Sequence, residues 1–269
     1  MRQIAIIMSV YKNDNLNDLK EALGSLYAQT EKADIFIQQD GFLSNELESY
    51  LDIELEREHI AYLGKRDENF GLAYSLNELL KKVLLNYEYI VRMDADDIST
   101  SRRIELQYNF LKQNDKLDIV GGYIEEFGDG FAYKKVVKYP LEHNKMFAFF
   151  SKRVPLAHVS VMYKNSFFKK VGFYPTSSLT NEDTLMWMMG FDKGCIFSNI
   201  PEILVKVRVN KDFFTRRGGL KKSWNDLKDR LMVIKVLGYN FSSYGYAFAL
   251  FLINLMPGNI KKILYKRLR

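Results

Sequence analysis

The first half of the chain alternates short apolar runs with segments of helical periodicity. The apolar runs are rich in β-branched and aromatic residues, which is typical of buried strands. They cover residues 4–10, 35–38, 60–63, 89–93 and 119–123. Between the third and fourth runs, leucine and valine recur three or four positions apart over residues 72–84, which predicts an amphipathic helix. This alternation favours an α/β fold in which helices cover a mainly parallel central sheet.

The second half has a different pattern. From about residue 134 helical segments and short strands are mixed, and we expect them to pack onto the first half as one lobe. From residue 210 the chain becomes basic and helical. We therefore predict a domain over residues 1–210, divided into halves at 1–125 and 126–210, and a C-terminal helical extension over residues 211–269.

Composition narrows the class of protein. A chain of 269 residues with 47% hydrophobic content can bury a substantial core, so a disordered chain is excluded. The single cysteine, Cys195, forms no internal disulfide, and three histidines argue against a Cys/His zinc site, so a reducing compartment is expected. The apolar run at residues 4–10 lacks a cleavage site and is interpreted as a strand, not a signal peptide. No apolar stretch reaches the roughly 18 residues of a transmembrane helix.

Polar clusters follow the early strands. These clusters are Ser9-Val10-Tyr11, Gln39-Asp40-Gly41, Asn69-Phe70-Gly71 and Asp94-Ala95-Asp96-Asp97. Ligands of α/β sheets bind outside the carboxyl ends of the strands. We therefore expect the four clusters to line one site.

The acidic cluster predicts a metal site. In an extended chain Asp94 and Asp96 project to the same side, while Asp97 points away. Two adjacent carboxylates repel unless a cation lies between them, and Mg²⁺ or Mn²⁺ accepts carboxylate and diphosphate oxygens together. The alternative is a polar turn before a helix that begins near Arg102, with Ser101 as its N-cap.

The order of these motifs along the chain resembles that of a known family of proteins. Ser-Val-Tyr, Gln-Asp-Gly, Asn-x-Gly-Leu-Ala, Asp-Ala-Asp-Asp and, further along, Asn-Glu-Asp follow one another as they do in the inverting family 2 glycosyltransferases of the GT-A fold. The chain resembles the bacterial capsular, O-antigen and exopolysaccharide members of that family. The likeness covers residues from about 4 to 210.

The resemblance implies a nucleotide-sugar site. Its residues would be Ser9, Tyr11, Asp40, Asn69, Gly71, Ala73, Asp94 and Arg102. By this likeness Asp40 contacts the base, Asp94 lies by the ribose and diphosphate, and Asp96, with Asp94, holds the metal. Arg102 or Arg103 would reach the donor. Alternatively, Asp40-Gly41 is a turn dipeptide and Gly71 only begins a helix.

Sugar transfer with inversion requires a general base that takes the proton of the attacking hydroxyl. The resemblance assigns this role to Asp183, with Glu182 as its neighbour or as an acceptor ligand. The alternative is structural, because Thr180 and Asp183 also match a capping box.

Other segments give weaker signals. The resemblance places His158 on the donor-sugar or acceptor side, although a lone histidine after a proline is commonly structural. The family's arginine after the Glu-Asp motif is replaced by Trp187-Met188-Met189, and Asn210 occupies the position of its histidine. The third metal ligand is therefore left open.

The C-terminal part carries the positive charge. The whole chain has a net charge of +6, and basic residues concentrate after residue 210. An apolar segment at residues 244–256 followed by a basic one at 257–269 would lie on an anionic membrane surface. Alternatively, Phe248, Leu252 and Leu255 dock on the main domain. No nucleic-acid recognition motif accompanies the charge, so nucleic acid is not expected as a partner.

Together these features predict a hexosyltransferase that depends on Mn²⁺ or Mg²⁺. Its donor would be a nucleotide-diphosphate sugar, a UDP-hexose or UDP-N-acetylhexosamine. Its acceptor would be a glycan or undecaprenyl-linked oligosaccharide in bacterial surface polysaccharide biosynthesis, reached from the cytoplasmic face of the inner membrane. The alternative is a membrane-surface binding or scaffold protein with a degenerate, non-catalytic nucleotide-sugar pocket.

Overall fold

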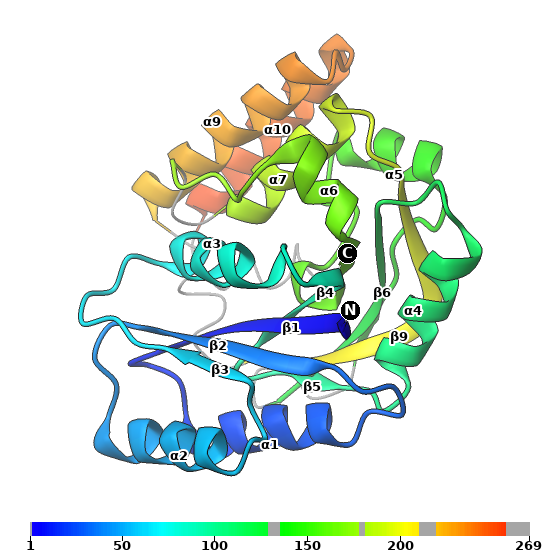
Figure 1. The fold of residues 1–269 in the computed structure, drawn as a ribbon. Helices are drawn as coiled ribbons and strands as arrows, with labels where there is room; N and C mark the ends of the chain where they lie inside the picture. Colours follow the sequence, from blue (N-terminus) through cyan, green and yellow to red (C-terminus); the bar gives the residue numbers. More distant parts are fainter. Residues whose placement is uncertain (1, 129–134, 178–180, 210–218, 257–269) are drawn as a thin grey trace.

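The computed structural model describes residues 2–128, 135–177, 181–209 and 219–256. Within these residues nine strands form one mixed sheet with the order β3-β2-β1-β4-β8-β6-β9-β5, and β7 pairs with β6 (Figure 1). The strands are β1 (Arg2–Tyr11), β2 (Asp34–Asp40), β3 (Tyr62–Gly64), β4 (Tyr87–Asp94), β5 (Ile98–Ser99), β6 (Ile119–Phe127), β7 (Lys135–Val137), β8 (Met162–Lys164) and β9 (Phe197–Arg208).

Helices cover the two faces of this sheet, and two more form an outer layer (Figure 1). They are α1 (Leu16–Tyr27), α2 (Asn45–Glu56), α3 (Leu72–Val83), α4 (Arg103–Gln113), α5 (His143–Phe150), α6 (Asn165–Val171), α7 (Glu182–Asp192), α9 (Leu220–Val236) and α10 (Phe241–Leu255), with a 3₁₀ turn, η1, at His158–Ser160. The α/β class predicted from the pattern is confirmed. All five predicted strands exist. The third begins two residues later than expected, because Ile60 is buried in the turn that precedes it.

The strands β1, β2 and β4 create an edge of the sheet at which polar residues gather. β1 pairs in parallel with both β2 and β4. In that register Ser9 lies opposite Asp94, and Tyr11 lies opposite Asp40. The polar ends of the three strands therefore meet at one edge of the sheet.

The second half extends the sheet with both orientations. β8 is antiparallel to β4 and β6, whereas β9 runs parallel to β6. The end of β9 also pairs with β5, which follows the acidic cluster directly. This pairing brings Arg208, the last residue of β9, beside that cluster.

Alternation along β1 divides the core into two layers. Ile4, Ile6 and Met8 face α1, α2 and α4, whereas Ala5 and Ile7 face the layer of α3, α5, α6 and α7. A fully buried aliphatic side chain contributes about 1.5–3 kcal/mol to stability, so these two layers fix the sheet between its helices.

The helices α9 and α10 form an outer layer beyond α7 (Figure 1). Val233 of α9 joins the second core, and Leu227 and Ile234 pack with Ala247 of α10. The predicted boundary at residue 210 falls outside the described residues, so the division into domains stays a prediction. In the part of the chain that the structure describes, no helix is both long and apolar enough to cross a bilayer.

The outer face of α10 is exposed, which contradicts the alternative that its large apolar side chains dock on the main domain. Phe248, Leu252 and Leu255 would be covered if they docked on the main domain, yet they are 51%, 58% and 42% exposed. The helix instead packs against α9 through its small residues, Ser243 and Ala247. The basic segment at residues 257–269 lies outside the described residues.

Candidate functional site

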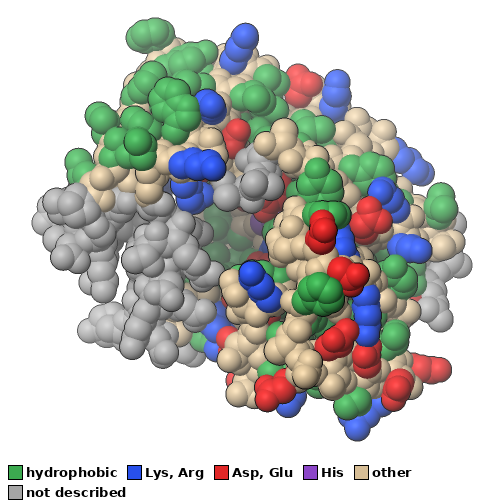
Figure 2. Space-filling model, turned by 90° about the vertical axis from the view of Figure 1, so that its left-hand side faces the viewer, with side chains coloured by type: hydrophobic (Ala, Val, Ile, Leu, Met, Phe, Trp, Pro, Cys, Tyr) green, Lys and Arg blue, Asp and Glu red, His purple; other side chains and the backbone are tan. Residues whose placement is uncertain are grey.

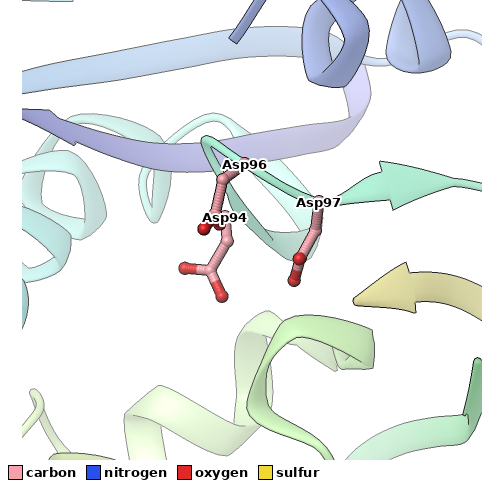
Figure 3. Close-up of side chains that lie close together, drawn as sticks. All are labelled: Asp94, Asp96 and Asp97. Carbon is pink, nitrogen blue, oxygen red and sulfur yellow. The ribbon is translucent and has the colours of Figure 1, made fainter. Parts of the chain in front are cut away.

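The acidic cluster lies where β4 ends. Asp94 is the last residue of the strand, and the chain turns at Ala95 and Asp96 before β5 begins. Because of this turn, carboxylate oxygens of Asp94, Asp96 and Asp97 lie within 4.8 Å of one another (Figure 3). The expectation that Asp97 points away was therefore wrong, since it assumed that the extended chain continued past Asp94.

The three carboxylates suit a hard divalent cation. Mg²⁺ binds oxygen at about 2.0–2.1 Å, so its ligand atoms lie roughly 3–4 Å from one another, which is compatible with the observed cluster. Without a cation these groups repel one another. Burial, followed by the charge of Asp94, raises the pKa of both Asp96 and Asp97.

Arg92 partly compensates this negative charge. It lies two residues before Asp94 on the same face of β4 and is 3% exposed. Its Nη1 and Nη2 atoms each lie 2.5 Å from an Asp94 oxygen. Sequence analysis missed this role, although the alternation of side chains along a strand was sufficient to place Arg92 and Asp94 together.

A fourth carboxylate, Asp14, lies close to the cluster. Its Oδ2 atom accepts a hydrogen bond of 2.8 Å from the Tyr11 amide at the end of β1. Burial, followed by the charges of Asp96 and Asp94, raises the pKa of Asp14 to about 7. The polar residues that follow the first strand were the only sequence signal for this group.

Arg208 ties the acidic turn to the rest of the domain. Its backbone amide donates to Asp97 Oδ1 at 2.8 Å, and its Nε donates to the carbonyl of Asp96 at 3.0 Å. Its guanidinium also pairs with Glu21 at 2.6 Å and with Asp18 at 3.3 Å, both on α1. Asn210, at the position of the family's histidine, lies outside the described residues.

Asp40 organises the loop before α3. Its carboxylate is buried and accepts hydrogen bonds of 2.9 Å from the amides of Phe70 and Gly71, and it also pairs with Arg66. Asn69 donates to the Asp40 carbonyl at 3.1 Å. A base contact by this carboxylate would therefore have to share or replace one of these bonds.

Gly71 and Ala73 begin α3. Gly71 is the N-cap residue with φ of +97°, a conformation that favours glycine. Ala73 is buried and packs in the second core. The structure thus brings Asp40, Asn69 and Gly71 together, and the strand register sets Tyr11 beside Asp40.

The two arginines proposed for the donor occupy different environments. Arg102 is exposed and pairs with Glu105 at 3.2 Å, so the structure does not bring it to the acidic cluster. Arg102 is also the N-cap position of α4, in place of the expected Ser101. Arg103 is fully buried, and its guanidinium donates to the carbonyls of Arg92 and Val159, which makes it a structural connection between β4 and η1.

The start of α7 carries the proposed base. The helix begins at Glu182 with Asn181 as N-cap, so Asp183 occupies its second position, one short of the capping-box position. Thr180 lies outside the described residues. Asp183 Oδ1 accepts from the Thr184 amide at 2.6 Å. Burial, followed by the charge of Asp183, raises the pKa of Glu182.

His158 belongs to a buried hydrogen-bonded chain. Its Nε2 atom lies 2.9 Å from the Tyr174 hydroxyl, which lies 2.6 Å from the Tyr163 hydroxyl. Burial, with a smaller contribution from Arg92, lowers the pKa of His158 well below its usual value. The imidazole is therefore neutral at physiological pH and held in a fixed orientation.

The acidic turn, η1 and the start of α7 contribute side chains to one cavity of about 890 Å³. It is lined by Asp94 and Asp97 from the acidic turn, by His158 from η1 and by Asp183 from α7. It continues along α9 and α10. A site with an acidic cluster and a separate carboxylate on one cavity has the groups needed to hold a metal-bound leaving group and to remove a proton.

Comparison with known proteins agrees with this geometry. The family model described as Glycosyl transferase family 2 matches residues 5–172. An uncharacterized glycosyltransferase of Haemophilus influenzae is 34% identical, covering 98% of this chain and 98% of its own length. The UDP-Gal:α-D-GlcNAc-diphosphoundecaprenol β-1,3-galactosyltransferase of Escherichia coli is 28% identical, with coverage of 98% and 96%.

A solved structure shows the same fold. The mannosyltransferase PcManGT from Pyrobaculum calidifontis, in complex with GDP-Man and Mn²⁺, has a TM-score of 0.65 to this chain at 15% sequence identity. The likeness covers 92% of this chain and 73% of that chain. The GT-A fold predicted from the sequence is confirmed.

Proposed function

The chain belongs to glycosyl transferase family 2, and on this premise we propose that it transfers a sugar from a UDP-sugar to a hydroxyl group of a lipid-linked glycan, with inversion and with a bound Mn²⁺ or Mg²⁺. The reaction contributes to a bacterial surface polysaccharide, as the names of its relatives indicate. The observation that carries the proposal is that Asp94 and Asp183 line the same cavity.

Asp94, Asp96 and Asp97 would hold the metal ion beside the donor diphosphate. When bound, the ion stabilises the negative charge that develops on the leaving group. The compact arrangement of three carboxylates supports this assignment, as does the Mn²⁺ in the complex of the mannosyltransferase neighbour. Arg92 fixes the orientation of Asp94, and Arg208 holds the turn that carries Asp96 and Asp97.

Asp183 would accept the proton of the attacking acceptor hydroxyl. Geometry favours it over Glu182, because Asp183 lines the cavity whereas Glu182 is buried behind it. The neutral His158, which also lines the cavity, would orient a sugar hydroxyl by hydrogen bonding. At the donor side, Ser9, Tyr11, Asn69 and Gly71 would border the nucleotide, as the family resemblance implies.

A lipid-linked acceptor requires contact with a membrane surface. The exposed aromatic and aliphatic side chains Phe241, Phe248 and Leu252 of α10 support peripheral binding at the cytoplasmic face of the inner membrane. Figure 2 shows hydrophobic side chains gathered at the top of the molecule, where α9 and α10 lie. The diphosphoundecaprenol acceptor in the name of the Escherichia coli relative fits this arrangement.

A donor screen tests the proposal. Purified protein with Mn²⁺ is incubated with UDP-sugars and a pool of lipid-linked acceptors, and release of UDP is measured. We expect release with one UDP-sugar that requires both metal and acceptor, and its loss in Asp96→Ala, with the variant still folded by circular dichroism. UDP binding without turnover across the whole panel would favour the non-catalytic scaffold instead.

A further inference from the structure

The cavity is lined by several kinds of chemical group. Asp94 and Asp97 line it from the acidic turn after β4, whereas α9 and the segment after α5 contribute the cations Arg153, Lys222 and Arg230 together with the carboxylates Asp226 and Asp229. Leu227 of α9 and Leu250 and Phe251 of α10 add an apolar part. Figure 2 shows the hollow below the hydrophobic helices, with Lys and Arg side chains at its upper edge. The contributions of α9 and α10 lie beyond residues 5–172, the region that the family model matches.

Arg230 is the cation best placed to bind an anion. It is half-buried, its Nη1 atom donates to the Phe150 carbonyl at 2.8 Å, and its guanidinium stacks on the Phe150 ring at 5.5 Å. Among the described residues no carboxylate forms an ion pair with it. Asp226, one turn earlier on α9, instead pairs with Lys222 at 3.3 Å and accepts from Asn181 at 2.9 Å.

A fixed, partly desolvated guanidinium with unused donors suits a phosphate group. Guanidinium binds phosphate oxygens through two parallel hydrogen bonds, and burial makes each of these bonds stronger than in water. Burial lowers the pKa of Arg230, while the charges of Asp183 and Asp226 act in the opposite direction. Arg230 and Asp183 line the same cavity.

The groups that line the cavity match one class of molecule. Asp183 would meet a sugar hydroxyl, Arg230 a diphosphate, and the apolar side chains of α9 and α10 a hydrocarbon chain. The volume of about 890 Å³ is within the range of sites that enclose a small ligand. An acceptor sugar joined through a diphosphate to an isoprenoid has these three parts.

We propose that Arg230 binds the diphosphate of an isoprenoid-diphosphate-linked acceptor and makes this diphosphate a requirement for efficient transfer, while Leu227, Leu250 and Phe251 contact the first isoprene units. The inference rests on the proposed function, since it assigns a substrate class to the same site. It places a specificity-determining residue on the C-terminal helices, outside the half that binds the donor.

The test compares two acceptors that carry the same sugar. One is linked through a diphosphate to an undecyl chain, and the other is the undecyl glycoside without the diphosphate. We expect Arg230→Gln to lower kcat/KM for the first acceptor by roughly 10–100-fold, mainly through KM, and to change it less than about 3-fold for the second.

Arg230→Lys keeps the charge and should retain most of the preference for the acceptor that carries the diphosphate. Lys228→Gln is the matched control, because Lys228 is exposed on the same helix, over Trp224. Equal losses for both acceptors in Arg230→Gln, or no loss, would overturn the inference.

A binding measurement separates this inference from the proposed function. Calorimetry in EDTA, with UDP present to occupy the donor site, compares farnesyl diphosphate with farnesol. We expect tighter binding of the diphosphate to the wild-type chain and loss of that difference in Arg230→Gln but not in Lys228→Gln. If the wild-type chain transfers sugar to neither acceptor, the proposed function fails, and this measurement still decides the role of Arg230. Equal binding of both probes to the wild-type chain would refute it.

Discussion

Arg92 and Asp94 form a double ion pair on one face of β4, with both guanidinium nitrogens 2.5 Å from carboxylate oxygens. Arg92 is almost fully buried, and its Nε atom has no hydrogen-bond partner among the described residues. The pair therefore holds one carboxylate of the acidic cluster in a fixed orientation and offsets part of its charge. Among the described residues, Asp96 and Asp97 form no comparable ion pair with an arginine or lysine side chain.

Removing the Arg92 charge should destabilise the metal-free protein. Arg92→Gln leaves Asp94 next to two other carboxylates without its partner, and because Arg92 is buried the loss should exceed the roughly 0–1 kcal/mol that an exposed ion pair contributes. Urea unfolding in EDTA measures this loss. Arg102→Gln is the matched control, since Arg102 is exposed and, among the described residues, pairs with Glu105, and it should change the free energy of unfolding much less than Arg92→Gln does. A similar small cost for both variants would contradict the role of Arg92.

Stability of the metal-free protein should fall as pH rises. The folded-state pKa values of Asp14, Asp96, Asp97 and Glu182 are raised, so folding favours their protonated forms. This stabilisation is fully present below the pKa of an unfolded carboxyl group, about 4. It is lost as the pH rises through the pKa of each group in the folded state, which is about 7 for Asp14. We expect the contribution of these four groups to the free energy of unfolding in EDTA to fall by a few kcal/mol between about pH 5 and pH 8. Below about pH 6.5 the lowered pKa of His158 opposes this fall, so the net loss of stability should be clearest between about pH 6.5 and pH 8.

Metal should reverse this dependence. Because a cation binds the deprotonated carboxylates, Mn²⁺ should stabilise the protein more at pH 8 than at pH 5. Asp14→Asn keeps an oxygen that can accept from the Tyr11 amide but removes one titrating group, so it should flatten the pH profile. Urea unfolding at both pH values, with EDTA or Mn²⁺, measures both effects. Stability in EDTA that rises between about pH 6.5 and pH 8 would show that the carboxylates are not held close together.

The sequence was sufficient to predict the fold and the edge of the sheet that carries the site. Buried strands such as residues 4–10 and 89–93 have clear apolar patterns, and the carboxyl ends of parallel strands necessarily meet. It was not sufficient for the turn after Asp94. Whether Asp97 joins the cluster depends on β9, whose residue Arg208 donates to Asp97 from 111 positions away. A contact of that range leaves no local pattern in the sequence.

The two carboxylates at the start of α7 should differ in their effect on transfer. Asp183→Asn removes the proposed proton acceptor while preserving size, so kcat should fall by roughly 100–10,000-fold with little change in the KM of the donor. Glu182→Gln should reduce kcat by less than about 10-fold if Glu182 only neighbours the base. Steady-state kinetics and melting temperatures of both variants decide the assignment. A large loss in Glu182→Gln with a mild one in Asp183→Asn would reverse the two roles.

Arg208 should affect metal binding without contacting the metal. Arg208→Gln removes the contacts with Asp18, Glu21 and the Asp96 carbonyl, while the backbone bond to Asp97 remains possible. Loss of such supporting contacts weakens metal affinity by about 10–100-fold. Calorimetric titration with Mn²⁺ in the presence of UDP measures it. Unchanged affinity would mean that the turn holds its shape without this side chain.

Some features of the site could not be predicted from sequence motifs. The terminal helices were predicted from their basic and apolar patterns, but nothing in the sequence indicated that Arg230 would line the same cavity as Asp183. That juxtaposition depends on how α9 packs against α7 through Val233 and its neighbours. Packing between helices far apart in sequence follows from side-chain shapes in three dimensions, which periodicity alone does not encode.

The central claim is that the acidic cluster binds a divalent ion together with the donor diphosphate. Electron paramagnetic resonance of Mn²⁺ titrated into the protein with UDP tests it most directly, because free and bound ions are distinguished without turnover. We predict one Mn²⁺ bound per chain in the wild-type protein, and binding weakened by at least about 10-fold in Asp96→Asn. Equal Mn²⁺ binding by the wild-type protein and this variant, or no bound Mn²⁺ in the wild-type protein, would contradict the claim.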